Sequence, residues 1–311
     1  MKKRRCRDNT RASPFLSDNV QTRKEAFQKQ GLKMRSFVLA LGAALLIPTL
    51  SPAQTLERIK ETGQITLGFR EDAAPLSYLA DNRPQGYAPS VCFELVNKIG
   101  GQLGLEEVDV VFLPVDTENR FDKVASGEID ILCGAATITL SRRERVDFSI
   151  PIYVDGTTVV LRKDGPQSLP ELSGRKIGVR AATTTFEALT NTLAAEGIDA
   201  EVVQFSDHGS GLAAVEGSAV DAYFADQSIL MDMVMQSESA NDLKVLDQIL
   251  TVEKQGLALA KGDAEFRLVV DRGLSELFRD GKVRAIFEQE ITGATPGLAL
   301  EAMFLLSPTL Q

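Results

Sequence analysis

Short apolar runs alternate with amphipathic stretches through most of the chain. The runs are bounded by glycine, proline and polar residues, and apolar residues recur every three or four positions in the stretches that follow. This alternation predicts an α/β protein. The predicted strands are Gln64–Phe69, Asp109–Pro114, Ile129–Cys133, Thr157–Arg162, Lys176–Arg180, Glu201–Phe205, Ala219–Phe224, a short Lys244–Leu246, and Gly256–Ala260. The predicted helices are Ser90–Leu103, Arg120–Ser126, Thr185–Glu196, Gly211–Glu216, Gln227–Gln236, Ala264–Asp280 and Val283–Glu290, and the tail 292–311 is assigned no element.

The pattern also predicts two lobes. The breaker run Lys163-Asp164-Gly165-Pro166 indicates a crossing from one lobe to the other, and Gly256–Ala260 can return the chain. We therefore expect residues 54–160 and 256–311 to form lobe 1 and residues 161–255 to form lobe 2, each around a doubly wound, mostly parallel sheet. Two crossings imply a hinge with a ligand cleft between the lobes.

The first 53 residues have the pattern of an export leader. Met34-Arg35-Ser36 precedes the apolar run 37–50, and Ser51-Pro52-Ala53 fits a cleavage site after Ala53. The run covers 14 positions, fewer than the roughly 20 apolar residues of a membrane span. The basic segment before Met34 is an extended leader, a nucleic-acid tail or sequence upstream of an early start codon. The last is favoured, because Met34 opens a complete signal, and both Met1 and Met34 remain candidate starts.

The remaining chain is acidic. Residues 54–311 hold 23 of the 34 basic and 40 of the 43 acidic residues. This charge argues against nucleic acid or an anionic membrane as a partner. An anionic ligand stays compatible with it, since a few oriented donors in a cleft outweigh a distant, screened field. We expect a soluble, exported monomer.

The cysteine and histidine content argues against a metal or redox site. Cys6 lies in the leader, which leaves Cys92 and Cys133. An even pair in an oxidising compartment predicts a disulfide, with two buried free thiols as the alternative. The chain has one histidine and neither a Cys-x-x-Cys nor a His-Glu-x-x-His motif, so no zinc site and no other cofactor is predicted.

The stretch Gly134–Tyr153 has the composition of a carboxylate site. Thr139 can cap a helix whose first backbone N–H groups would face an anion. Arg142, three residues later, can offer a bidentate guanidinium to the same anion. The alternative is a solvated basic turn, because Arg143 and Arg145 lie beside Arg142.

This stretch resembles the signature of bacterial extracellular solute-binding proteins for amino acids, in which Thr-x-Thr-x-x-Arg precedes Val-Asp-Phe-Ser-x-Pro-Tyr. Here the last dipeptide is interrupted and reads Pro151-Ile152-Tyr153. Three further blocks, Gly68–Glu71, Pro114–Arg120 and Asp207–Gly209, narrow the resemblance to the periplasmic glutamate/aspartate-binding proteins of ABC importers. The resemblance implies a two-lobed type II periplasmic-binding-protein fold with a two-strand hinge, a periplasmic location and a cognate ABC permease as partner.

The resemblance also implies roles for single residues. The family's arginine that matches Arg142, with groups matching Thr137 and Thr183, holds the ligand α-carboxylate. Thr183 directly precedes a predicted helix, so it can also be a plain helix cap. Asp226 matches the partner of the α-ammonium group, and its alternative role is to cap the helix that begins at Gln227.

Arg70, Arg120 and His208 match family positions that hold the ligand's side-chain carboxylate, with Thr117 adding a hydroxyl. Two guanidinium groups in one pocket are costly without a second anion, which is the main argument for an acidic ligand. If His208 is protonated it adds a donor, and affinity for an acid should hold or rise between pH 8 and pH 6, on either side of a histidine pKa of about 6.5.

Each of these residues also has a structural alternative. Arg70 can pair with Glu71 or Asp72, Arg120 with Asp116 or Glu118, and His208 can merely shape the loop Ser206–Gly211. Two positions depart from the family pattern. Ala135 replaces a serine and leaves only its backbone carbonyl to accept from an ammonium group, and Ala181-Ala182 precedes Thr183 in place of Ser-Gly. These departures concern affinity and the choice between glutamate and aspartate more than the amino-acid class.

The sequence therefore predicts a secreted receptor that closes on an acidic L-amino acid and presents it to an ABC importer, without catalysis. A receptor for another polar amino acid is one alternative. An exported cyclohexadienyl- or arogenate-dehydratase-like enzyme on the same fold is another, with Glu71, Asp72 or Glu118 as general acid, although nothing pairs these acids at a defined spacing. A sensory ectodomain is less favoured, since no kinase segment follows, and the export signal argues against a transcription-factor effector domain.

Overall fold

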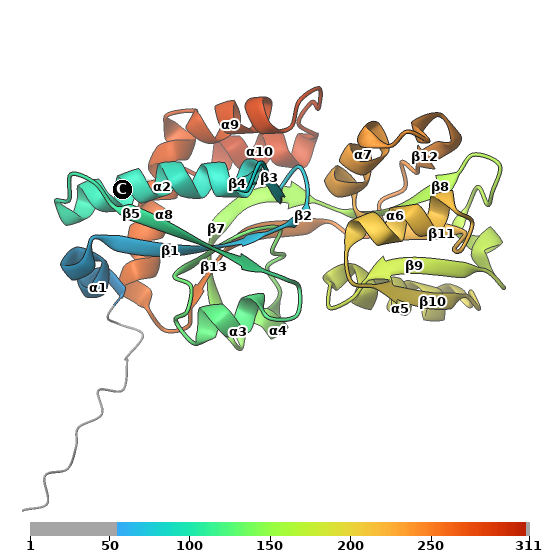
Figure 1. Cartoon of the computed structure of the whole chain (residues 1–311), viewed down its shortest axis with the longest axis horizontal. Helices are drawn as coiled ribbons and strands as arrows, with labels where there is room; N and C mark the ends of the chain where they lie inside the picture. The colour runs from blue at the N-terminus through green and yellow to red at the C-terminus, as the bar shows by residue number, and fades with distance from the viewer. Residues whose placement is uncertain (1–54, 309–311) are drawn as a thin grey trace, which may run out of the picture. The chain divides into compact units, whose positions relative to one another are not determined.

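The computed structural model describes residues 55–308, which contain two five-stranded sheets and one small sheet (Figure 1). The first sheet has the order β5 (Asp109–Val115), β1 (Gln64–Arg70), β6 (Ile131–Cys133), β13 (Glu253–Ala260) and β7 (Val146–Asp155). The second has the order β10 (Glu201–Phe205), β9 (Lys176–Arg180), β11 (Ala222–Asp226), β8 (Thr157–Arg162) and β12 (Leu243–Val245). The small sheet contains β2 (Asp72–Ala73), β3 (Ser77–Ala80) and β4 (Arg83–Gln85). The predicted leader, its apolar run 37–50 and its cleavage site lie outside the described residues.

Helices cover both faces of each large sheet, as a doubly wound fold requires (Figure 1). They are α1 (Thr55–Thr62), α2 (Tyr87–Leu103), α3 (Arg120–Ala125), α4 (Leu140–Arg143), α5 (Thr184–Glu196), α6 (His208–Glu216), α7 (Gln227–Gln236), α8 (Ala264–Arg279), α9 (Lys282–Glu290) and α10 (Leu298–Leu306). The tail that the sequence left unassigned thus contains a helix. None of the helices in residues 55–308 is long and apolar enough to cross a bilayer.

The strands are apolar on both faces because each sheet is buried on both. Successive strand residues point to opposite faces. In β6, Ile131 packs into the core formed with α2, α8 and α9, whereas Leu132 packs with α3 on the other face. In β11, Phe224 packs toward α5 and Tyr223 toward α6. Such near-continuous apolar runs are typical of parallel strands covered on two sides, and strands β1, β5 and β6 as well as β9, β10 and β11 pair in parallel.

The chain crosses between the sheets twice, at positions that differ from the expected boundaries. The boundaries at 160/161 and 255/256 fall inside β8 and β13, and are corrected by the strand pairing. The first crossing lies at Gly156, between β7 and β8, and the second lies just before Glu253. A Cβ atom on Gly156 would lie 2.3 Å from the carbonyl oxygen of Thr251, so glycine is required where the two crossing segments meet.

Strand β7 was not predicted, because Pro151 interrupts its apolar pattern. Proline is tolerated in a strand at a sheet edge or beside a bulge. Both conditions hold here: β7 is the last strand of the first sheet, and its pairing with β13 shifts register where Pro151 meets Gly256.

The predicted disulfide between Cys92 and Cys133 is present. It joins α2 to the end of β6, across 41 positions of sequence, and both residues belong to the buried core of the first lobe. The bond ties the helix that covers the first sheet to the strand that leads into the candidate site.

Candidate ligand-binding site

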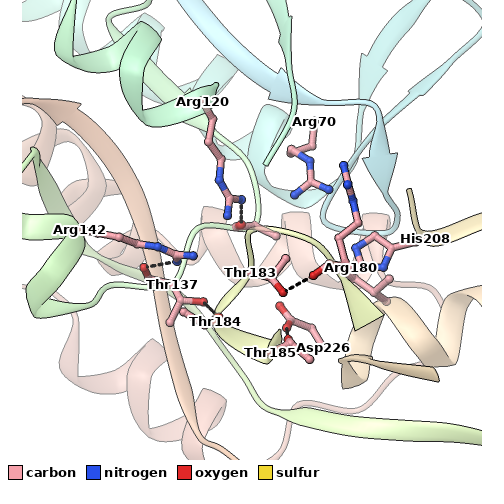
Figure 2. Close-up of a pocket in the computed structure, with 12 residues that line it drawn as sticks. Arg70, Arg120, Thr137, Arg142, Arg180, Thr183, Thr184, Thr185, His208 and Asp226 are labelled. Carbon is pink, nitrogen blue, oxygen red and sulfur yellow. Dashed lines mark hydrogen bonds between the residues drawn. The ribbon is translucent and has the colours of Figure 1, made fainter. Parts of the chain in front are cut away.

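A narrow cleft lies where the two sheets face each other. Residues from both sheets line it, and Figure 2 shows Arg120, Arg142 and Arg70 directed toward the side on which Thr183 and Asp226 lie. Ligands of open α/β sheets bind outside the carboxyl ends of the strands, which is where β1, β6, β9 and β11 end here. Of the predicted site residues, those that line the cleft are Arg70, Arg120, Ala135, Thr137, Arg142, Thr183, His208 and Asp226.

Arg142 is held at one end of the cleft. Its backbone N–H donates to Thr139 Oγ1 at 3.2 Å, so Thr139 is the helix cap that the sequence predicted. The Arg142 Nη1 atom donates to the carbonyl oxygen of Thr137 at 2.8 Å, and burial lowers the pKa of the guanidinium. Because α4 has only four residues, the guanidinium and not the helix end is the stronger positive group of this segment.

Thr183 lies on the opposite side of the cleft, at the start of α5. Its hydroxyl oxygen accepts from the Phe186 N–H at 3.2 Å, and its hydroxyl donates to the Arg180 carbonyl at 2.8 Å. Thr183 is therefore a helix cap and a cleft residue at once. The first turn of α5, which has 13 residues, brings uncapped backbone N–H groups and the positive end of a helix to the cleft.

Arg120 lies between the two ends without a carboxylate partner among residues 55–308. Its Nη1 atom donates to the Ala135 carbonyl at 2.9 Å, and its buried Nε atom has no partner. The pairing with Asp116 or Glu118 that the sequence allowed does not occur: Asp116 instead accepts from the backbone N–H groups of Glu118 and Asn119, each at 2.8 Å. Burial, followed by the charges of Arg70 and Arg142, holds the pKa of Arg120 well below its ordinary value.

Arg70 adopts its structural alternative. The Arg70 Nε atom donates to Asp72 Oδ1 at 2.9 Å, and Nη2 contacts the same oxygen. Burial lowers the pKa of Arg70, while the charge of Asp72 opposes the shift. Arg70 therefore lines the cleft with its charge partly neutralised by the protein.

His208 lines the cleft, but the structure differs from the loop-shaping alternative. It is not in a loop but is the first residue of α6, which Asp207 caps. The His208 Nδ1 atom lies 2.9 Å from the Tyr223 hydroxyl. Burial, aided by the positive charge of Arg70, lowers the pKa of His208 to about 3. With this pKa the imidazole is neutral between pH 8 and pH 6 and supplies no charged donor there. The expectation that affinity for an acid holds or rises over that range stays a prediction.

Asp226 occupies the position before α7, yet its side chain makes no capping hydrogen bond. Its carboxylate accepts from Gln255 Nε2 at 2.7 Å and faces Thr185 Oγ1 at 3.5 Å. Burial, then the charges of Asp155 and Glu253, raise the pKa of Asp226 well above its ordinary value. The capping alternative is thus wrong, and the carboxylate is directed into the cleft where a cation would stabilise it.

Thr117 and Ala135 are not available to a ligand in the way that the sequence predicted. Thr117 is buried, but it does not line the cleft and its hydroxyl oxygen has no partner. The Ala135 carbonyl, expected to accept from a ligand ammonium group, already accepts from Arg120.

Glu253, which the sequence did not single out, organises the threonines at the crossings. Its carboxylate accepts from Thr137 Oγ1 at 2.5 Å, Thr184 Oγ1 at 2.8 Å and Thr157 Oγ1 at 3.1 Å. These threonines come from both lobes, so a single buried carboxylate connects the two walls of the cleft. In the sequence, Glu253 reads as one of several charged residues before an apolar run, and nothing local marks it as buried.

Thr184 and Thr185, which follow Thr183 at the start of α5, also line the cleft, as do Arg180 and Ile229, which sequence reasoning missed. A signal for Arg180 existed, since it is the last residue of a predicted strand and Arg70 directly follows one.

Comparison with known proteins identifies the family. Residues 65–292 match the model of the bacterial extracellular solute-binding proteins, family 3. The chain belongs to this family. A relative from Pseudomonas aeruginosa, an L-glutamate/L-aspartate-binding protein, is 30% identical over 260 residues, which cover 83% of this chain and 86% of that protein. The glutamate/aspartate import solute-binding protein of Escherichia coli is 26% identical over 280 residues, which cover 88% of this chain and 92% of that protein.

Solved structures agree with the fold. The chain matches the crystal structure of the ancestral amino acid-binding protein AncCDT-1, a precursor of cyclohexadienyl dehydratase, with a TM-score of 0.66 and 24% identity, over 76% of this chain and 99% of that one. This likeness concerns the fold alone, and it confirms the two-lobed arrangement that the sequence predicted for a family 3 protein.

Proposed function

We propose that this chain is an extracytoplasmic receptor that captures an acidic L-amino acid, glutamate or aspartate, and delivers it to an ABC importer. The observation that carries the proposal is Arg120, a buried guanidinium with an unpartnered Nε atom and no ion pair within residues 55–308. A buried charge without a counter-charge is costly, and a ligand carboxylate beside Arg120 removes that cost. The names of the Pseudomonas aeruginosa and Escherichia coli relatives support the same ligand class.

The α-amino and α-carboxylate groups of the ligand define one end of the proposed pose. Arg142, together with Thr137 and the first turn of α5 at Thr183, holds the α-carboxylate. Asp226 faces the α-ammonium group. Two observations support that role: the carboxylate does not cap α7, and its pKa is raised. Groups from both lobes contact the ligand in this pose, so it favours the closed form.

The side-chain carboxylate defines the other end. Arg120 is its main partner, and Arg70 contributes the part of its guanidinium that Asp72 does not occupy. Neutral His208 bounds this end of the cleft, and Thr117, which is buried but does not line the cleft, makes no direct contact in this pose.

The proposal includes a place and a partner. The family consists of extracellular proteins, and we infer a periplasmic monomer, released from its signal peptide near Ala53, that docks on a cognate permease. The acidic charge of residues 54–311 supports a small-molecule ligand over nucleic acid. We expect no catalytic activity.

A thermal-shift screen of the purified protein against the twenty amino acids tests this function. A ligand present at 100 times its Kd adds about 2.7 kcal/mol of stability, so glutamate and aspartate should raise the melting temperature most. Amides that raise it as much as the acids would contradict the acidic-ligand assignment.

A second candidate is a dehydratase on the same fold, and one observation favours it. Asp226 is a cleft carboxyl whose pKa is raised by burial and by neighbouring carboxylates, which is the property of a general acid. Turnover of a prephenate-like acid, absent in an Asp226→Asn variant, would establish this function in place of the receptor.

A further inference from the structure

A further buried arginine, Arg180, enters the cleft from the second sheet. It ends β9 and its side chain is almost fully buried. The Arg180 Nε atom lies 3.1 Å from Asp72 Oδ2, and its Nη1 atom donates to the Phe205 carbonyl at 3.4 Å. Asp72 belongs to β2, in the small sheet that packs on β1 and α2 of the first lobe.

Asp72 is shared by two arginines. One carboxylate oxygen accepts from Arg70 Nε at 2.9 Å, and the other faces Arg180 Nε. Burial by itself would raise the pKa of Asp72, but the charges of Arg70 and Arg180 hold it below its ordinary value. Both arginines thus have a counter-charge supplied by the protein, in contrast to Arg120.

The two ion pairs of Asp72 differ in what they connect. Arg70 and Asp72 are two positions apart on the first lobe, whereas Arg180 belongs to the second sheet. The lobes are linked covalently only by the crossings at Gly156 and before Glu253. A hinge motion at these crossings therefore separates Arg180 from Asp72 and leaves the pair of Asp72 with Arg70 intact.

We propose that the ion pair of Asp72 with Arg180 is an interlobe latch, which stabilises the closed cleft whichever ligand occupies it. A second interlobe contact supports the same arrangement, since Thr137 Oγ1 and Thr184 Oγ1 lie 3.3 Å apart near the hinge. In Figure 2, Arg180 lies on the side of the cleft opposite Thr137 and Thr184, so the latch and the threonine contact hold different parts of the cleft.

The latch has a distinct signature in binding. The fraction of protein in the closed form enters every dissociation constant in the same way, so loss of the latch weakens acids and amides by the same factor. Loss of a direct contact with the ligand's side-chain carboxylate would instead weaken the acids alone. This effect on affinity rests on the proposed function, whereas closure itself is measurable without any amino acid.

The experiment compares the wild-type protein with Arg180→Gln, Asp72→Asn and the double variant. Each protein is first freed of copurified ligand by dialysis in urea and then refolded. Small-angle X-ray scattering measures its radius of gyration, and titration calorimetry measures the Kd of glutamate and of glutamine. Arg175→Gln is the matched control, because Arg175 pairs with Asp221 at 3.3 Å within the second lobe. Arg180→Lys keeps the charge, and circular dichroism checks that every variant is folded.

We expect a larger radius of gyration for Arg180→Gln and a loss of about tenfold in affinity for both amino acids. The double variant should lose less than the product of the two single losses, Arg180→Lys should recover part of the closure, and Arg175→Gln should match the wild type. Selective loss of glutamate binding, or scattering and affinities equal to those of the wild type, would overturn the latch. Failure of the wild type to bind either amino acid would reject the proposed function, and the scattering comparison would still decide the latch.

Discussion

The guanidinium of Arg120 donates to the backbone carbonyl of Ala135 at 2.9 Å, and both residues line the cleft. This contact fixes the direction of the side chain without neutralising its charge. The ring of Phe121 supports it, with the Arg120 Cζ atom 4.9 Å from the ring centroid and the Arg142 Cζ atom 5.0 Å from it. The two arginines assigned to the two ligand carboxylates are therefore oriented by one aromatic side chain.

Arg120→Met should reduce the difference between acidic and amide ligands. The substitution keeps an apolar stem against Phe121 and removes the uncompensated charge, so glutamate should lose on the order of 3 kcal/mol, about a hundredfold in Kd, while glutamine changes little. Calorimetry with both ligands measures the gap. Arg145→Met is the control, because Arg145 pairs with Asp122 on the surface. An unchanged ratio of the two affinities would show that Arg120 does not contact the side-chain carboxylate.

Arg142→Ala should abolish binding of acids and amides alike, because both carry the α-carboxylate that Arg142 is proposed to hold. The neighbouring Arg143→Ala, which changes a residue of α4 that does not line the cleft, should bind as the wild type does. Calorimetry with glutamate and glutamine measures both variants. Micromolar affinity in the Arg142 variant would contradict the assignment.

Ligand binding should release protons from Asp226. The pKa of this carboxyl is raised by burial and by Asp155 and Glu253, and an ammonium group placed beside it favours the ionised form. Binding enthalpies measured across a pH series in buffers of different ionisation enthalpy should therefore indicate proton release, of up to about one proton per ligand, at the pH values where the free carboxyl is protonated. Asp226→Asn should bind weakly and without that release. A wild-type enthalpy independent of buffer would show that Asp226 does not meet the ammonium group.

The unfolding free energy should fall as the pH drops below about 6.5, the pKa of His208 in the unfolded chain. The folded-state pKa is about 3, so the unfolded state binds a proton that the folded state does not. The stability that the neutral His208 contributes is fully present above pH 6.5, and about 2 kcal/mol of it is lost by pH 5. Urea unfolding measures the unfolding free energy at pH 7.5 and at pH 5. Between these pH values the His208→Gln variant should lose about 2 kcal/mol less unfolding free energy than the wild type does. Equal losses in the variant and the wild type would mean that His208 titrates normally in the folded protein.

Replacing Cys92 and Cys133 by alanine should destabilise the first lobe. The bond spans 41 positions, and closing a loop of this length contributes on the order of 4 kcal/mol in the chain-entropy model. Urea unfolding of the double variant and of the reduced wild type should give similar midpoints, both below that of the oxidised protein. Two free thiols in the mass spectrum of the unreduced protein would contradict the bond.

The sequence by itself determined the local elements and the chemistry of several site residues. Apolar periodicity located most of the strands and helices, because the two large sheets are buried on both faces and their strands are short and apolar. Thr139 and Thr183 were identified as helix caps from their positions alone, and Cys92 and Cys133 were paired because only two cysteines follow the leader.

Only the tertiary structure decided which charges meet. Asp72 and Arg180 are 108 positions apart and belong to different sheets, so no local pattern connects them. Glu253 is buried because threonines from both lobes surround it, and His208 is neutral because packing at the start of α6 removes it from water. Hydrogen-bond partners and desolvation depend on the packing of distant segments, whereas helix caps and strand periods depend on near neighbours in the chain. For this protein, residues close together in the sequence therefore determined the helices and strands. The packing of the two lobes against each other decided which charged groups of the cleft are paired, unpaired or neutral.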